Sequence, residues 1–253
     1  MIIRILKLLN FPPPDEADMQ YNKKYLNRSV VFCAVFTLAV TALFFIFNYY
    51  MHHIYSIGFY FLFDHKKLIS LTLFLYLSAS ALFAVFLIIE KFGFNTKLIP
   101  ALGLKTKNAK AAFLNKFWFA IPFFITSCVI LAIRIFLADD GKADFSYLIH
   151  EIPNNMIIAF CEEVMFRGYI QGVMTKRFGD LRGIAFTSVL FLFVHLPIRI
   201  LFESNTLPRL LYLLFYTFAG GIAFGIVARR DKCVYGSVFV HFTFNICNYI
   251  MLY

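Results

Sequence analysis

Three clusters of polar residues in the second half of the sequence carry side chains that can move protons and stabilise negative charge. They are Glu162, Glu163 and Arg167; then His195; then His241 and Asn245. Each cluster interrupts a hydrophobic stretch, where a charge costs about 2.5 kcal/mol or more even on a lenient insertion scale. Ionisable residues in such places are functional by default, so these clusters are the first candidates for an active site.

The combination of side chains suits hydrolysis of an amide bond. A carboxylate can deprotonate water, and a histidine can orient that water or pass protons. Neutral donors such as Asn245 and His241 can stabilise the oxyanion of a tetrahedral intermediate. Glu163 and Arg167 lie four residues apart, so they share a helix face and can pair. Glu162 points about 100° away from Glu163 on a helix, and the two carboxylates are expected to differ in role.

The depth of the clusters indicates that they meet. At a rise of about 1.5 Å per residue, Glu162, His195 and Asn245 lie roughly 16–18 Å from the cytoplasmic ends of their hydrophobic segments. The same rise places His241 and Arg167 at about 10 Å. Because segment ends are uncertain by about 2–4 residues, these values predict one polar chamber shared by three helices.

The composition places this chamber in a membrane. Hydrophobic residues make up 61% of the 253 residues, charged residues make up 15%, and the mean hydropathy is +0.75. A chain this apolar cannot bury its surface in an ordinary water-soluble core. We therefore predict an all-α fold, a polytopic membrane helix bundle that forms a single membrane domain over residues 1–253.

Seven segments are long enough to cross a hydrocarbon core of about 30 Å. They are 29–50, 68–89, 117–137, 153–174, 183–202, 207–228 and 234–253. An eighth, half-buried element at 52–63 is left open, which gives seven to eight transmembrane helices. Three of the last four segments carry the polar clusters, so residues 154–253 are predicted to form the catalytic half.

The loops predict an orientation. With a cytoplasmic N-terminus, the inside segments hold seventeen Lys and Arg residues and the outside segments hold five. This positive-inside bias predicts a multi-pass protein of the cell (inner) membrane with its C-terminus outside. Topology and attraction to anionic membrane lipids explain the net charge of +10, so no nucleic acid is expected as a partner. Residues 1–11 mix apolar and basic positions and are predicted to lie at the membrane interface.

The order of the three motifs, EExxxR, FxxxH and HxxxN, in successive hydrophobic segments resembles the CPBP family. These membrane proteases include the type II CAAX prenyl endopeptidases and bacterial proteins of bacteriocin processing and self-immunity. All three motifs match, over about 154–253. The resemblance implies that Glu162 activates water with His195 and that His241 and Asn245 form the oxyanion site. It also implies that Glu163 supports the site through its ion pair with the arginine.

The role of a metal is left open by the residues. Glu162, His195 and His241 could form a zinc site of two histidines and one glutamate, with water in the fourth position. The chain has no HExxH motif, and Asn245 is a poor zinc ligand that is better explained as a donor to an oxyanion. Metal-free glutamate catalysis without a cofactor is therefore favoured, with zinc as the alternative.

These observations predict an intramembrane endopeptidase that cleaves a membrane-associated protein or peptide tail, a lipidated C-terminal tail being one candidate substrate. One alternative is a non-catalytic bacteriocin self-immunity or scaffold protein of the same fold. A less favoured alternative is a proton-coupled transporter, because glutamate and histidine chains also relay protons across membranes. The sequence shows no inverted repeat of the kind common in transporters.

Overall fold

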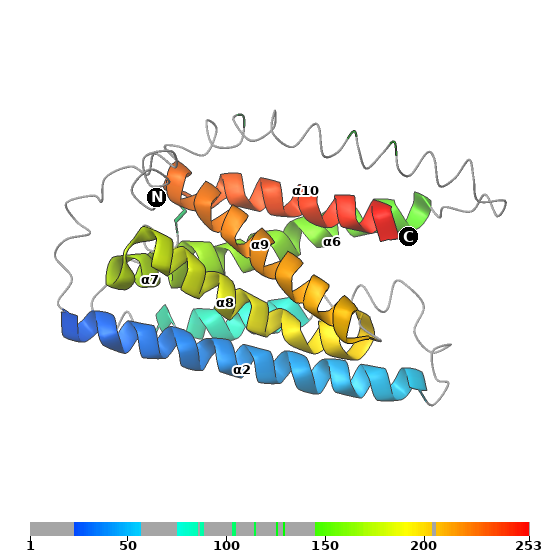
Figure 1. The fold of residues 1–253 in the computed structure, drawn as a ribbon, viewed down its shortest axis with the longest axis horizontal. Helices are drawn as coiled ribbons and strands as arrows, with labels where there is room; N and C mark the ends of the chain where they lie inside the picture. The colour runs from blue at the N-terminus through cyan, green and yellow to red at the C-terminus, as the bar shows by residue number, and fades with distance from the viewer. Residues whose placement is uncertain are drawn as a thin grey trace.

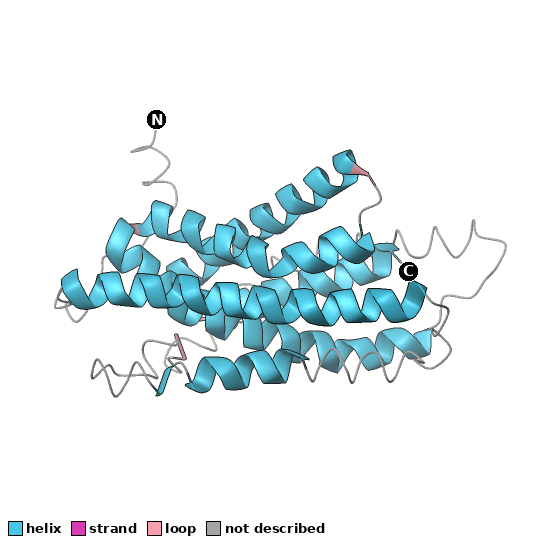
Figure 2. Cartoon of the chain, turned by 90° about the horizontal axis from the view of Figure 1, so that it is seen from below, coloured by secondary structure: helices cyan, strands magenta, loops and turns pink. Residues whose placement is uncertain are grey.

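The structure is a computed structural model, and the part of the chain that it describes is 23–56, 75–85, 87–88, 103–104, 114, 125, 129, 145–203 and 206–252. Every element within these ranges is a helix, and no strand occurs among them (Figure 2). The predicted all-α class is therefore confirmed. The interfacial segment 1–11, most of the span 117–137 and most of the element at 52–63 lie outside the described residues.

The described part of the chain forms a series of helical elements. They are α2 (Lys23–Ser56), α6 (Phe145–Glu163), η4 (Val164–Ile170), α7 (Gln171–Phe178), α8 (Asp180–Ile198), η5 (Arg199–Glu203), α9 (Leu207–Asp231) and α10 (Tyr235–Leu252). The elements η4 and η5 are π-helical, and a shorter apolar helix covers Leu75–Val85. Helix α6 continues without a break into η4, and η4 continues into α7.

Three helices among the described residues are long and apolar enough to cross a membrane, namely Leu26–His53, Asp180–Leu201 and Leu207–Asp231. They support an integral membrane protein, while the predicted count of seven to eight is not established by them. Helices α6 and α10 cover much of two other predicted spans, but they carry the polar motif residues, which lower their hydropathy.

The helices pack in an order that brings the motif-bearing segments together. Helix α2 runs along one side of the bundle against α7 and α8, and α9 crosses α8 obliquely to reach α10 (Figure 1). In turn, α10 packs against α6. Aromatic contacts join the helix Leu75–Val85 to this core, because Phe83 lies 5.2 Å from Phe36 of α2 and 5.8 Å from Tyr169 of η4, between ring centroids.

A tight turn between α7 and α8 sets the direction of α8. Gly179 has φ 82°, a left-handed conformation that costs a residue with a Cβ roughly 1 kcal/mol or more. Asp180 then begins α8, and its carboxylate accepts a 2.7 Å hydrogen bond from Arg229 at the end of α9. An acidic first turn and a basic last turn complement the two helix dipoles.

Most hydroxyl groups inside the bundle bond to their own helix. Thr37 donates to Cys33 O at 2.8 Å, Thr187 to Gly183 O at 2.8 Å, and Ser188 to Ile184 O at 2.9 Å. Such bonds satisfy a hydroxyl where hydrocarbon offers no partner. These hydroxyl residues therefore have a structural explanation within their own helices.

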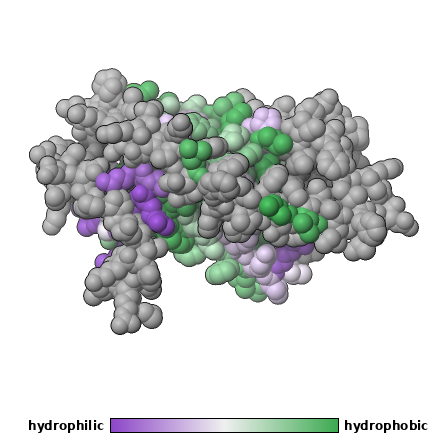
Figure 3. Space-filling model, turned by 90° about the horizontal axis from the view of Figure 1, so that it is seen from above, coloured by the Kyte–Doolittle hydropathy of each residue, from purple (hydrophilic) through white to green (hydrophobic). Residues whose placement is uncertain are grey.

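The outer surface of the bundle is apolar. In the view from above, hydrophobic side chains lie along the middle of the described surface, and hydrophilic ones gather in one patch toward the left and another at the lower edge (Figure 3). On α2, one face presents side chains that are more than half exposed, namely Val31, Val35, Leu38 and Ile46. Exposed apolar patches of this extent are unusual in water-soluble monomers and natural against lipid.

Candidate active site

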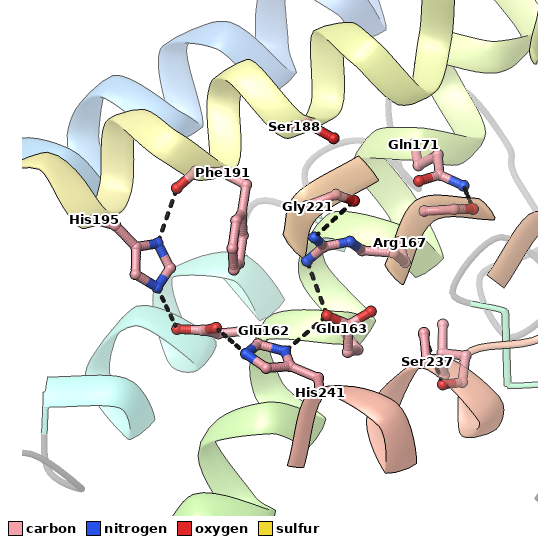
Figure 4. A network of polar contacts seen from close by, with 12 residues as sticks. Glu162, Glu163, Arg167, Gln171, Ser188, Phe191, His195, Gly221, Ser237 and His241 are labelled. Carbon is pink, nitrogen blue, oxygen red and sulfur yellow. Dashed lines mark hydrogen bonds and ion pairs between the residues drawn. The ribbon is translucent and has the colours of Figure 1, made fainter. Parts of the chain in front are cut away.

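The three motifs converge at the junction of α6 and η4 (Figure 4). Glu162 is the next-to-last residue of α6, and its Oε1 lies 3.8 Å from Nε2 of His195 on α8. Its Oε2 lies 3.6 Å from Nε2 of His241 on α10. The structure thus brings together residues separated by up to 79 positions in sequence and confirms that the three motif-bearing helices pack around a common point.

The second carboxylate belongs to a closed cluster, which we call the Glu163 anchor and define as Glu163, Arg167, Gly221 and the Nδ1 side of His241. Oε1 of Glu163 accepts from Arg167 Nη1 at 2.8 Å and from His241 Nδ1 at 2.9 Å. Arg167 Nη2 also donates to the backbone oxygen of Gly221 at 3.3 Å. The predicted ion pair is present, and with both side chains fully buried it ties η4, α9 and α10 together.

Aromatic rings enclose the charged groups of the anchor. The Arg167 guanidinium lies 4.2 Å from the ring centroid of Phe191 and 5.3 Å from that of Phe224, which are cation–π distances. Phe224 also stacks on His241 at 4.5 Å, and Phe191 lies 4.3 Å from the His195 ring. The phenylalanine of the second motif is thus a packing residue that orients both a cation and an imidazole.

The surroundings of Glu162 differ from those of Glu163. Only 2% of the residue is exposed, yet neither carboxylate oxygen has a hydrogen-bond partner among the described residues. A buried carboxylate without partners costs several kcal/mol, so such a group calls for a specific role. The unpaired oxygens mark the point where a water molecule or a substrate would bind.

The histidine tautomers define what faces Glu162. Nδ1 of His195 lies 2.9 Å from Phe191 O, which can only accept, so Nδ1 carries the proton. Nδ1 of His241 likewise faces the Glu163 carboxylate at 2.9 Å. When neutral, both rings therefore direct the Nε2 lone pair toward Glu162. Three acceptors meet there, and a water molecule with its two donors would complement them.

Asn245 lies one helical turn beyond His241 on α10 and is partly buried. No hydrogen bond or ion pair joins it to the described residues of the site. The structure therefore brings five of the six predicted site residues into direct contact and leaves Asn245 beside them.

Two groups of contacts were missed by the sequence analysis. Gln171 Nε2 donates to Gly225 O at 2.9 Å, one turn beyond the contact between Arg167 and Gly221. The two glycines form a GxxxG pattern, which is typical of close helix packing in membranes and could have been recognised. The stacking of Phe224 on His241 has no comparable signal in the sequence.

Glu162, His195 and His241 are the residues that a zinc ion would use as ligands. Glu162 and the two Nε2 atoms have suitable chemistry, since neutral imidazole and carboxylate are zinc ligands. Within the described part of the chain, however, no group of three or more His, Cys, Asp and Glu side chains has the spacing to hold a metal ion.

Comparison with known proteins identifies one family. Residues 145–247 match the model of the family Rce1-like, described as Type II CAAX prenyl endopeptidase Rce1-like. The match confirms the resemblance to the CPBP membrane proteases and includes all three motifs. No curated protein and no solved structure matches the chain.

Proposed function

We propose that this chain, whose C-terminal part is Rce1-like, is an intramembrane endopeptidase that uses Glu162 to activate water. Its family is a protease family, which supports hydrolase chemistry in general. The observation that carries the proposal is the buried carboxylate of Glu162, which has no hydrogen bond to the described residues and is flanked by two imidazole nitrogens at 3.6 and 3.8 Å. A general base must be desolvated, oriented and left with a free oxygen for water, and Glu162 meets these conditions.

The proposed reaction needs one water molecule and one proton acceptor. Glu162 takes a proton from water, and the resulting hydroxide attacks the carbonyl carbon of the scissile peptide bond. The tetrahedral intermediate then collapses as the C–N bond breaks, and the proton passes from Glu162 to the leaving nitrogen. His195 orients the water through Nε2, because its Nδ1 is engaged by Phe191 O.

His241 takes a role that depends on its charge. As a neutral ring it accepts a hydrogen bond at Nε2 and cannot donate to an oxyanion. With Nε2 protonated, the ring is an imidazolium whose Nδ1 faces the Glu163 carboxylate at 2.9 Å. We assign it the second state in the transition state, when Nε2 holds the proton that Glu162 took from the water. This proton later returns through Glu162 to the leaving nitrogen, and Asn245 is the neutral donor beside the ring. Glu163 and Arg167 position His241 and do not touch the reacting atoms.

The proposed setting is a multi-pass protein of the cell (inner) membrane with a cytoplasmic N-terminus, in contact with membrane lipids. The substrate is a membrane-associated protein or peptide, and a lipidated C-terminal tail is the form that the family description favours. No nucleic acid is involved. No resident metal or other cofactor is part of the proposal, and zinc is the alternative that chelation tests.

Two other functions compete with proteolysis. A self-immunity or scaffold protein of the same fold would act without cleavage, and a proton-coupled transporter would use the glutamates and histidines as a relay. Glu162 makes no hydrogen bond to the described residues, which favours the enzyme over the scaffold. A purely structural carboxylate is expected to form hydrogen bonds and an ion pair, as Glu163 does. The transporter predicts substrate flux without new peptide termini.

The deciding experiment compares peptide termini in membranes that contain the wild-type protein or Glu162→Gln. Mass spectrometry should find termini that depend on wild-type Glu162 and are absent with the variant. Equal amounts of both proteins in the membrane provide the control for folding. Identical termini in the two samples, together with an unchanged biological effect of the variant, would establish the scaffold instead.

A further inference from the structure

A residue that precedes the family match contacts two helices of the site. Gly103 lies ahead of residues 145–247, which match the family model. Its backbone oxygen accepts a 3.1 Å hydrogen bond from the backbone N–H of Val234, the residue before α10. A Cβ on Gly103 would lie 2.9 Å from Val234 Cγ1 and 3.5 Å from the Cα of Gly168 in η4. Gly103 therefore lies against both the start of α10 and η4.

The hydrogen bond from Val234 satisfies a backbone group that α10 does not satisfy. N–H groups at the beginning of a helix have no partner within the helix. Only 1% of Val234 is exposed, so water has little access to its N–H. The oxygen of Val234 is also fixed, since it accepts from Val238 N at 2.8 Å and from Ser237 Oγ at 2.9 Å. The oxygen of Gly103 is thus one of the partners that fix the point where α10 begins.

Two properties favour glycine at position 103. Its φ is 67°, a left-handed conformation that is costly for a residue with a Cβ. The approach of 2.9 Å to Val234 Cγ1 is also closer than the optimal separation of about 3.5–4.0 Å between carbon atoms. Gly179 shares only the first property, because its φ is 82° but a Cβ there would meet nothing within 4 Å. Position 103 therefore requires a glycine for its close approach to Val234 as well as for its backbone conformation.

The two elements that Gly103 contacts carry the hydrogen-bond partners of Glu163. His241 lies seven residues after Val234, which is about two helical turns, so the two residues share a face of α10. In η4, the contact with Gly103 directly follows Arg167. Arg167 and His241 both donate to Oε1 of Glu163, at 2.8 and 2.9 Å. A displacement of α10 relative to η4 would therefore move the His241 ring.

We propose that Gly103 is a positioning residue, which sets the distance between η4 and the start of α10 and thereby the approach of His241 to Glu162. Nε2 of His241 lies 3.6 Å from Oε2 of Glu162. A displacement of about 1 Å at such a site can cost about 10²-fold in rate. The effect of Gly103 on turnover rests on the proposed function, whereas its contacts with α10 and η4 do not.

The first test compares two glycine substitutions. Gly103→Ala and Gly179→Ala both place a Cβ on a residue with positive φ, but only the first adds a contact at 2.9 Å. With turnover expressed per folded protein, Gly103→Ala should lower kcat about 10-fold and leave KM within about twofold, because His241 is displaced. Gly179→Ala should leave both constants within about twofold. Equal effects of the two substitutions on kcat, or a rise in KM alone, would overturn the proposal.

The second test is rescue by a smaller neighbour. Val234→Ala removes Cγ1, the atom that a Cβ on Gly103 would meet. The double variant Gly103→Ala/Val234→Ala should therefore have a kcat about threefold or more above that of Gly103→Ala alone. The double variant also serves if Gly103→Ala alone does not fold, since it should then restore folded protein. Failure of the double variant to recover either turnover or folding would refute the proposal.

The third test does not require any activity. Thermal unfolding in detergent is measured for the wild type, Gly103→Ala, Val234→Ala and the double variant, which form a double-mutant cycle. Gly103→Ala should lower Tm about twice as much in the wild type as in the Val234→Ala background. Additive shifts would refute the contact.

Coupled Tm shifts have two further outcomes. If the shifts are coupled but Gly103→Ala leaves kcat unchanged, the contact is retained and the positioning role is refuted. If they are coupled in a protein that cleaves no peptide, the contact is retained and the proposed function is refuted.

Discussion

The two neighbouring glutamates at the end of α6 occupy opposite environments. Glu163 accepts two hydrogen bonds of 2.8 and 2.9 Å and is fully buried in an ion pair. Glu162 faces two imidazole nitrogens at 3.6 and 3.8 Å and has no closed hydrogen bond among the described residues. The same residue type, one position apart, thus serves as an anchor on one side and as an available base on the other.

Glu163 is therefore expected to contribute to folding stability, and the adjacent Glu162 to the chemical step. His241 is the link between the two sides, since Nδ1 contacts Glu163 and Nε2 faces Glu162. The Glu163 anchor holds the His241 ring in place. The ring is in turn expected to define where the water or the oxyanion binds. Substitutions on the two sides should therefore affect different measurements, and five experiments test that separation.

The largest effect on activity is expected from a substitution of Glu162. Glu162→Gln keeps the size and hydrogen-bonding capacity of the side chain but cannot accept a proton at neutral pH. Peptide hydrolysis should fall by about 10⁴ or to background, while Tm changes little. Turnover and thermal unfolding of the same purified preparation measure both quantities. Substantial remaining activity would show that a residue other than Glu162 is the general base.

On the anchor side, Glu163→Gln should act mainly on stability. The amide leaves Arg167 as a buried charge without its counter-charge, which typically costs about 3–5 kcal/mol. Part of the activity should remain at low temperature, where the protein is still folded. If Glu163→Gln stopped hydrolysis in a stable protein and Glu162→Gln did not, the two roles would have to be exchanged.

Asn245→Ala tests whether Asn245 on α10 acts with Glu162 in the reaction or with the Glu163 anchor in stability. As an oxyanion donor, Asn245 should contribute about 10²–10³ in turnover, with KM little changed. Its lack of hydrogen bonds to the described site residues predicts a small effect on Tm. A loss of stability without a loss of turnover would place Asn245 with the anchor.

Two adjacent glycines on α9 offer a matched pair for the anchor. A Cβ on Gly221 would lie 3.0 Å from Ser188 Cβ, whereas one on Gly220 would meet nothing closer than 3.6 Å. Gly221→Ala should therefore cost about 1–3 kcal/mol through overpacking and push Arg167 from its carbonyl partner. Gly220→Ala should be close to neutral. Equal thermal shifts for both variants would contradict the close approach of α8 and α9.

The smallest effect is expected from chelation. If Glu162 activates water directly, activity should persist after exhaustive treatment with a zinc-selective chelator, and metal analysis should find well under one ion per chain. A zinc enzyme would lose activity and regain it on addition of metal, because metal-bound water would supply the nucleophile. Recovery with zinc, combined with a mild effect of Asn245→Ala, would refute the metal-free mechanism.

The sequence predicted the contacts that depend on local spacing. The pairing of Glu163 with Arg167 follows from four-residue spacing, and the meeting of three motifs follows from their similar depth. The depth estimate nevertheless placed His241 about 8 Å shallower than Glu162, at about 1.5 Å per residue. It assumed parallel helices that start at one level, whereas α9 crosses obliquely and α10 begins further along the bundle than α8 (Figure 1).

Other features of the site depend on packing that no local pattern determines. The tautomers of His195 and His241 follow from the partners of their Nδ1 atoms, and these partners are known only once the helices are placed. The π-helical segment η4 has no sequence signature either.

That segment makes the site sensitive to chain length. In η4 the N–H of Gln171 bonds to Phe166 O, five residues back, so the segment holds more residues per turn than an α-helix. Because the π-helical segment holds one more residue than an α-helix of the same total rotation, deleting one residue from 164–170 would let it become α-helical while α6 and α7 keep nearly the same relative orientation. Glu162 would then still face the histidines. Within that range, a deletion between Glu163 and Arg167 would also shorten their four-residue spacing, so it should weaken the ion pair of the Glu163 anchor.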